Sequence, residues 1–186
     1  MLPKILIGLG ILVLLFVSIV ATRPAAFHIE RSTTISAPPE RAFALVNDFH
    51  AWPVWSPYEK LDPQMKKTFE GPAAGTGAVY SWAGTPKVGE GRMTIEKSQA
   101  PSLVSLKLEF FKPFTATNTG TFSFVQVPEG TRVTWAMDGR NGFAAKAASL
   151  FMNMDKLVGT DFERGLAAMK AAAESAPKMD ATTAGK

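Results

Sequence analysis

The sequence predicts an α+β protein in which a curved antiparallel sheet of about seven strands wraps around one long C-terminal helix, with a transmembrane helix ahead of this domain. Three observations predict it. An uncharged apolar run occupies residues 5–21. Short segments of alternating apolar and polar residues recur from residue 27 to residue 139, as in half-buried strands. From Phe143 onward, apolar residues recur at steps of three and four, which indicates an amphipathic helix.

The N-terminal run, ILIGLGILVLLFVSIVA, has two interpretations. At about 17 residues it reaches the lower end of the length that crosses a hydrocarbon core. A cleaved signal peptide would have a shorter apolar core, of about 7–15 residues, and a small residue where Ile19 stands. We therefore favour an uncleaved, single-pass membrane anchor through residues 5–21.

Charges flank this run on both sides and specify its orientation weakly. Lys4 precedes the run, and Arg23 and Arg31 follow it. We expect the amino terminus inside and the soluble domain outside, in a periplasmic or other extracytoplasmic compartment. The predicted organisation is an anchor and linker over residues 1–26, one domain over residues 27–175, and a small, polar, disordered tail over residues 176–186.

Composition excludes several classes of function. The 186 residues include no cysteine, so no disulfide, thiol nucleophile or zinc–thiolate site can form. The two histidines, His28 and His50, cannot supply a multi-histidine metal site. The formal net charge of +4 comes without a run of like charges, so the sequence offers no concentrated basic face for nucleic acid. We expect no metal, no cofactor and no nucleic-acid partner.

A strand and a group of short helices open the domain. FHIERSTTI, residues 27–35, alternates as a strand, and the two prolines of SAPPERAFALVNDF suit the first turn of a helix of about ten residues. The next stretch, DFHAWPVWSPYEKLDP, is too rich in proline for a long helix. Its tryptophans, Trp52 and Trp55, share a side of a helical turn. We interpret them as a structural plug that seats the short helices against the sheet rim, with direct ligand contact as the alternative.

Six further strand signals follow, and most of their connections are short enough for antiparallel pairing. They are KKTFEG, AVYSWAG, VGEGRMTIEKS, LVSLKLEFF, TATNTGTFSFVQV and TRVTWAMDG. The apolar steps from Phe143 then predict one helix of about 30 residues. Gly159 and Gly165 inside it indicate close packing or a bend, so we expect the helix to lie tightly on the sheet near its middle. A twisted sheet around one helix tends to leave an apolar cavity, a common form of ligand site.

Five stretches are together specific for a known superfamily: IERSTTISAPPERAFALVNDFHAWPVWSPYE, GAVYSWAG, VGEGRMTI, VTWAMDG and MNMDKLVGTDFERGLAAMK. They resemble the SRPBCC superfamily, also called START-like or Bet v 1-like, and within it the polyketide cyclase/dehydrase and lipid transport group. The resemblance covers residues 27–175. It implies a helix-grip fold, in which a curved sheet holds a C-terminal helix around a hydrophobic tunnel. It implies no particular activity, because these residues define the fold.

Eight residues are candidates for contact with a ligand in the cavity: Tyr80, Trp82, Glu90, Arg92, Trp135, Phe151, Met154 and Val158. Tyr80 and Trp82 share one strand face. Glu90 and Arg92 also share a face, and would either bind a polar head group or form a solvated surface pair. Phe151, Met154 and Val158 are expected mid-helix, where the sheet curves over.

Other ionisable residues are weaker candidates. Asp155 is expected on the exposed side of the helix, His28 on the exposed face of the first strand, and His50 in a capping or loop position. Asp138 would support catalysis only if it were buried with a raised pKa. We therefore assign no catalytic residue.

Three functions stay open at this point. The first is a membrane-anchored module that binds or transfers a hydrophobic small molecule or lipid. The second is a cyclase- or dehydratase-type enzyme acting on a polyketide-like or aromatic substrate, which rests on family analogy alone. The third is a partner-binding envelope protein whose own side chains fill the cavity.

Overall fold

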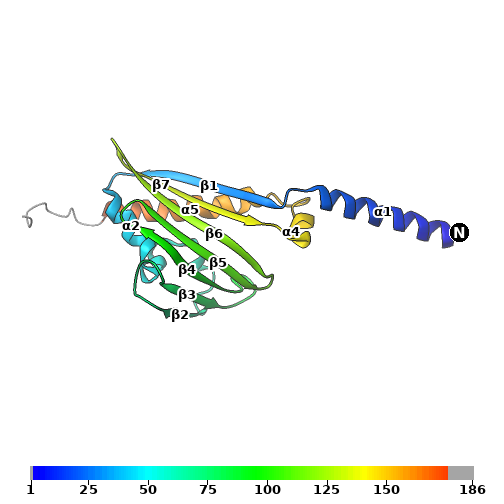
Figure 1. Cartoon of the computed structure of the whole chain (residues 1–186), viewed down its shortest axis with the longest axis horizontal. Helices are drawn as coiled ribbons and strands as arrows, with labels where there is room; N and C mark the ends of the chain where they lie inside the picture. The colour runs from blue at the N-terminus through cyan, green and yellow to red at the C-terminus, as the bar shows by residue number, and fades with distance from the viewer. Residues whose placement is uncertain (1, 176–186) are drawn as a thin grey trace, which may run out of the picture.

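The computed structural model describes residues 2–175, which contain a seven-stranded antiparallel sheet. Its strands are β1 (Ala26–Ile35), β2 (Lys66–Glu70), β3 (Val79–Ala83), β4 (Glu90–Gln99), β5 (Leu103–Lys112), β6 (Ala116–Val127) and β7 (Gly130–Arg140). The strand order is β1-β7-β6-β5-β4-β3-β2, so consecutive strands pair from β2 onward while β1 pairs with β7 (Figure 1). The predicted α+β arrangement of sheet and C-terminal helix is confirmed.

The C-terminal helical region consists of two helices, so the prediction of one continuous helix of about 30 residues is wrong. α4 spans Phe143–Ala148 and α5 spans Met154–Ser175. Asn153 caps the start of α5, because its side-chain oxygen accepts a hydrogen bond of 2.9 Å from the Lys156 backbone N–H. The apolar spacing continues across the break, and for that reason periodicity did not reveal it.

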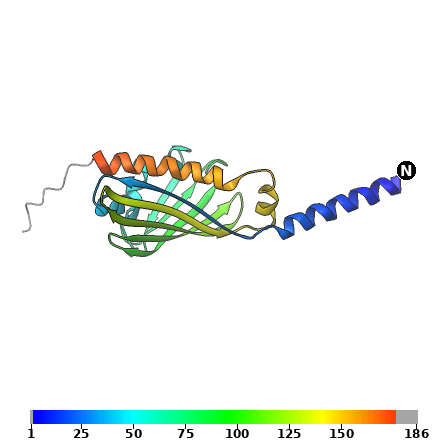
Figure 2. The same cartoon turned by 90° about the horizontal axis from the view of Figure 1, so that it is seen from above.

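α5 lies along one face of the sheet and contacts β1 most extensively (Figure 2). Both of its glycines are buried. A Cβ atom at Gly165 would lie 2.8 Å from the Trp135 ring, and one at Gly159 would collide with the Arg31 guanidinium. The expected close approach of helix and sheet is therefore confirmed at Gly165, whereas Gly159 makes room for the end of the Arg31 side chain.

Four short helices connect β1 to β2: α2 (Pro39–Asn47), η1 (Phe49–Ala51), α3 (Trp52–Trp55) and η2 (Pro57–Lys60). Trp52 and Trp55 are buried in this group. Trp52 Nε1 donates to the Val46 carbonyl over 3.0 Å, and Trp55 Nε1 donates to the Leu45 carbonyl over 2.8 Å. The last four carbonyls of a helix lack intrahelical partners, so the two indoles cap the C-terminal end of α2. This geometry supports the structural interpretation of the pair.

α1 (Leu2–Thr22) projects from one end of the domain (Figure 1). Within Pro3–Thr22, a window of 18 residues has a mean hydropathy of 2.9, and 6% of that window is buried in the protein. By length and composition α1 could cross a membrane. The predicted disordered tail, residues 176–186, lies outside the described residues.

Candidate ligand-binding cavity

A cavity of about 350 Å³ lies between the sheet and the N-terminal half of α5. Its sheet wall is apolar and includes Met93, Leu106, Leu108, Phe110, Phe122 and Met137. The helix wall includes Leu157, Val158 and Phe162. Leu61 and Leu157, which are 49% and 57% exposed, also line it and mark where it meets solvent. The cavity is thus a mostly apolar, partly open site of the kind that binds small molecules.

Four of the eight candidate residues line this cavity: Tyr80, Trp82, Trp135 and Val158. Trp135 stacks on Phe162 with ring centroids 3.9 Å apart, which joins the sheet wall to the helix wall. Trp82 Nε1 donates to the Val88 carbonyl over 3.0 Å, so its polar atom is satisfied by the β3–β4 loop. Trp52 lines the cavity as well, whereas Trp55 lies behind it. Trp52 therefore combines the capping role with a position at the cavity.

Glu90 and Arg92 are not among the residues that line the cavity. Glu90 pairs with Lys112 over 2.7 Å and Arg92 with Glu109 over 2.9 Å. Successive strand residues face opposite sides of a sheet, and buried Met93 shows which side of β4 faces inward. The two residues thus lie on the outer face, as the second alternative expected, but they pair with Lys112 and Glu109 rather than with each other.

Phe151 and Met154 also lie outside the cavity lining. Phe151 is 81% exposed because it falls in the connection between α4 and α5 rather than mid-helix. Met154 is the first residue of α5 and is 38% exposed. Leu157, one turn after Met154, lines the cavity instead. The predicted continuous helix had placed Phe151 and Met154 there.

The remaining ionisable candidates are on the surface. Asp155 is exposed and pairs with Arg31 over 3.0 Å, and this hydrogen bond lowers the pKa of the Asp155 carboxyl. His28 Nδ1 lies 2.7 Å from Asp138 Oδ1, and this contact raises the pKa of the histidine. His50 stacks on Phe69, outside the cavity. Within residues 2–175, no cluster of three or more histidine, aspartate or glutamate side chains could hold a metal ion.

The sequence reasoning missed a polar group at the cavity wall. Glu59, from η2, lines the cavity with a side chain that is 6% exposed. It accepts a hydrogen bond of 2.7 Å from the Tyr80 hydroxyl and pairs with Lys67. Burial, and then the contact with Glu59, raise the pKa of Tyr80. Glu59 and Lys67 lie on separate elements, and no sequence signal brings them together.

Tyr58 and Trp135, two residues of the cavity wall, make no side-chain hydrogen bond with the rest of residues 2–175. Because no fully buried side-chain nitrogen or oxygen in this part of the chain lacks a partner, the Tyr58 hydroxyl and the Trp135 indole N–H are open to solvent. The two rings meet edge to face, with centroids 6.4 Å apart. Burial raises the pKa of Tyr58, and the negative charge of Asp161 raises it further, so the phenol stays neutral and keeps its proton. Both groups can donate to an oxygen atom of a bound molecule.

The family follows from a match over nearly the whole domain. Residues 26–174 match the polyketide cyclase/dehydrase and lipid transport family. The chain belongs to this family. Its fold is accordingly the SRPBCC-type helix-grip fold that the sequence resemblance implied. No curated protein matches this SRPBCC chain.

Solved structures agree on the fold. The di-domain ARO/CYC BexL from the BE-7585A biosynthetic pathway is 18% identical, with a TM-score of 0.62, over 87% of this chain and 54% of that chain. The Aha1 dimer protein from Colwellia psychrerythraea is 14% identical, with a TM-score of 0.58, over 80% and 97%. Protein CV1439 from Chromobacterium violaceum is 13% identical, with a TM-score of 0.58, over 79% and 96%. At these identities the likeness concerns the fold alone.

Proposed function

We propose that this SRPBCC protein is a membrane-anchored module that binds or transfers a hydrophobic small molecule or lipid. The observation that carries the proposal is the apolar cavity between α5 and the sheet. Its volume of about 350 Å³ falls within the range of about 300–1,000 Å³ that small-molecule sites occupy. α1 supports the tether, because its length and composition suit a membrane span.

The cavity volume indicates the size of the ligand. At about 30 Å³ for each water-sized group, this volume corresponds to at least about a dozen methylene or ring carbons. A single acyl chain or a small fused ring system fits this space.

The two free donors add a chemical preference. Tyr58 and Trp135 leave a hydroxyl and an indole N–H unpaired at a mostly apolar wall that also includes Glu59 and Asp161. A ligand with one carbonyl, hydroxyl or carboxyl oxygen would satisfy both donors, and a pure hydrocarbon would leave them desolvated at a cost. The proposed ligand is therefore an apolar molecule with one oxygen-bearing end.

Native mass spectrometry on the full chain, taken from membranes without refolding, tests this function. The variant Val158→Trp fills the cavity, and Val125→Trp makes the same change on a side chain that is 55% exposed outside it. We expect a bound hydrophobic species in the wild type and in Val125→Trp, and a reduction of about tenfold or more in Val158→Trp. An empty wild type after incubation with a cell lipid extract, or equal loss from both variants, contradicts the proposal.

A cyclase- or dehydratase-type enzyme is the second candidate, and the Tyr80–Glu59 hydrogen bond favours it. A buried carboxylate and a phenol at a cavity wall are groups that acid–base chemistry uses. Tyr80→Phe removes the hydroxyl and keeps the ring. If the protein is an enzyme, the wild type converts the extracted ligand to a product that differs in mass, after dehydration, or in chromatographic retention, after cyclisation, and Tyr80→Phe does not. If it is a carrier, the ligand leaves both proteins unchanged.

The third candidate, an envelope protein with a filled cavity, has less support. That function required the chain's own side chains to fill the space between sheet and helix. The open volume beside α5 argues against it.

A further inference from the structure

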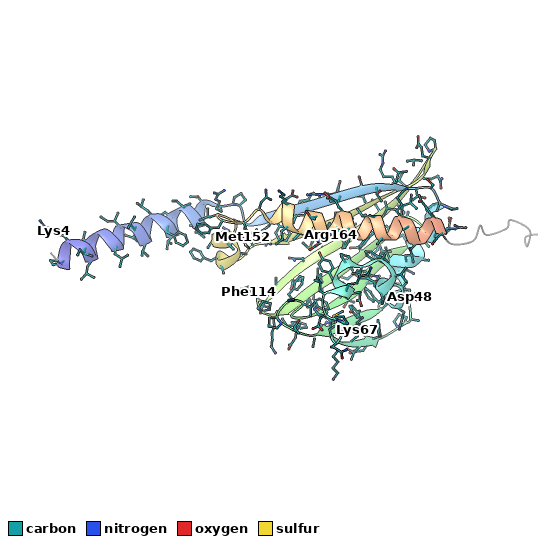
Figure 3. All side chains as sticks on the ribbon, turned by 180° about the vertical axis from the view of Figure 1, so that it is seen from behind. Lys4, Asp48, Lys67, Phe114, Met152 and Arg164 are labelled. Atoms are coloured by element: carbon teal, nitrogen blue, oxygen red, sulfur yellow. The ribbon has the colours of Figure 1, made fainter. Side chains whose placement is uncertain are left out.

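One edge of the domain exposes four large apolar side chains. They are Phe114 (72% exposed), Phe143 (53%), Phe151 (81%) and Met152 (50%), and we call them the apolar edge. They come from the β5–β6 turn, from α4 and from the α4–α5 connection. Figure 3 shows Met152 and Phe114 at the same end of the domain, the end that faces α1. Clusters of exposed apolar side chains on soluble domains mark interaction surfaces.

The sheet pairing explains why these segments share an edge. Ala26, where β1 starts, pairs with Arg140, where β7 ends. Ala116, where β6 starts, pairs with Phe110 near the end of β5. Because neighbouring strands are antiparallel, the start of β1, the end of β7 and the β5–β6 turn all lie at the same end of the strands, which is the edge of the domain described above. α4 follows β7 directly and lies there too.

The linker holds this edge close to the end of α1. Three residues, 23–25, separate Thr22 at the end of α1 from Ala26 at the start of β1, and three extended residues span at most about 11 Å. The Asn141 backbone N–H donates to the Ala25 carbonyl over 2.7 Å, which fixes the start of α4 beside the linker. α1 contacts α4, and Val20 is fully buried at this junction. If α1 spans a bilayer, the apolar edge must lie at the bilayer surface.

The charges at this edge suit a lipid surface. Arg23 and Arg140 are exposed and Lys146 is half-buried. None of the three forms an ion pair within residues 2–175. Unpaired cations around an apolar patch are the pattern by which surface-bound segments hold anionic lipid headgroups while their apolar side chains enter the interface.

We propose that the apolar edge is a second membrane-contacting element that docks on the lipid surface next to α1. This inference rests on the proposed function in one respect, the membrane anchor, and is independent of the ligand. Docking places the N-terminal end of α5 near the bilayer, and Leu157 there is both exposed and part of the cavity wall. The open side of the cavity beside Leu157 is therefore held close to lipid, where an apolar ligand can exchange with little exposure to water.

The absence of cysteine makes a direct test simple. Single cysteines are introduced in the full chain as Met152→Cys at the apolar edge, Val13→Cys in α1 and Glu129→Cys in the β6–β7 turn at the opposite edge. Each is labelled with nitrobenzoxadiazole and reconstituted in phosphatidylcholine/phosphatidylglycerol vesicles. Nitroxide groups on the acyl chains quench labels that enter the lipid. We expect strong quenching at positions 13 and 152 and weak quenching at position 129.

A second variant removes the docking side chains. Phe143→Ser with Phe151→Ser, in the Met152→Cys background, changes only exposed side chains, so circular dichroism should stay unchanged. Quenching at position 152 should fall toward the level at position 129, while the same pair of changes leaves position 13 quenched. Replacing phosphatidylglycerol with phosphatidylcholine should also lower quenching at position 152.

The outcomes separate this inference from the proposed function. Quenching at position 13 without quenching at position 152 overturns the docking surface and leaves the anchor standing. Absence of quenching at both positions overturns the anchor, and the docking surface with it. An apolar emission spectrum at position 152 without nitroxide quenching indicates a protein contact at this edge and also overturns the proposal. None of these results depends on whether the cavity holds a ligand.

Discussion

The two indole caps on α2 give the sharpest stability prediction. Trp55→Phe keeps an aromatic ring in the core but removes the donor that satisfies the Leu45 carbonyl over 2.8 Å. A buried carbonyl that loses its partner costs about 1–3 kcal/mol. The smaller ring also loses apolar contact worth about 1–2 kcal/mol, because Trp55 is 1% exposed. The free energy of unfolding should therefore fall by roughly 2–5 kcal/mol.

Thermal unfolding of the full chain, followed by circular dichroism, measures this loss. For a chain of 186 residues, each kcal/mol shifts Tm by about 2–4 °C, so Trp55→Phe should lower Tm by roughly 4–20 °C. Trp52→Phe is the matched variant, since it removes the donor to the Val46 carbonyl over 3.0 Å. It should lower Tm similarly and also change ligand binding, because Trp52 lines the cavity and Trp55 does not. A Tm for Trp55→Phe within about 1 °C of the wild type would refute the capping argument.

Two further predictions concern α5. Gly165→Ala should destabilise the protein by about 1–3 kcal/mol in urea unfolding, because the new Cβ would lie 2.8 Å from the Trp135 ring; Gly142→Ala, with open space around it, is the control. Arg31 lowers the pKa of Asp155 in the folded protein. The pair therefore stabilises the fold fully at pH values above the unfolded-state pKa of Asp155, about 3.9. This stabilisation is lost as the pH falls through the lower pKa that Asp155 has in the folded state. The difference in unfolding free energy between wild type and Asp155→Asn should accordingly be largest near neutral pH and shrink at acid pH, and a pH-independent difference would count against the ion pair.

Regular periodicity made the fold predictable from the sequence. Alternation in segments such as residues 27–35 and residues 131–139 indicates strands whichever residues they later pair with. The break before Met154 was not predicted, because apolar residues continue at helical spacing through residues 149–153. The signal was the Asn153 cap, a local hydrogen bond that outweighs periodicity at this position.

The residues that line the cavity were predictable only on the strands, where alternation decides which face of the sheet a side chain lies on. Tyr80, Trp82 and Trp135 lie at the cavity because apolar strand faces turn inward. The polar residues Tyr58 and Glu59 lie in the proline-rich segment around η2, and their positions depend on how that segment folds over the sheet. Periodicity says nothing about such a segment, so the groups most relevant to ligand chemistry came from the structure.

The two halves of α5 pack differently against the sheet, and the cavity lies beside the N-terminal half. Its C-terminal half packs closely, with Leu166, Met169 and Ala173 at most 2% exposed. Its N-terminal half is held by Arg31, which lies under Gly159 and pairs with Asp155 and Glu163. The Arg31 side chain thus lies between β1 and this half of α5. The cavity lies beside Leu157 and Val158, at the end nearest α1, and the proposed membrane docking brings that same end to the lipid.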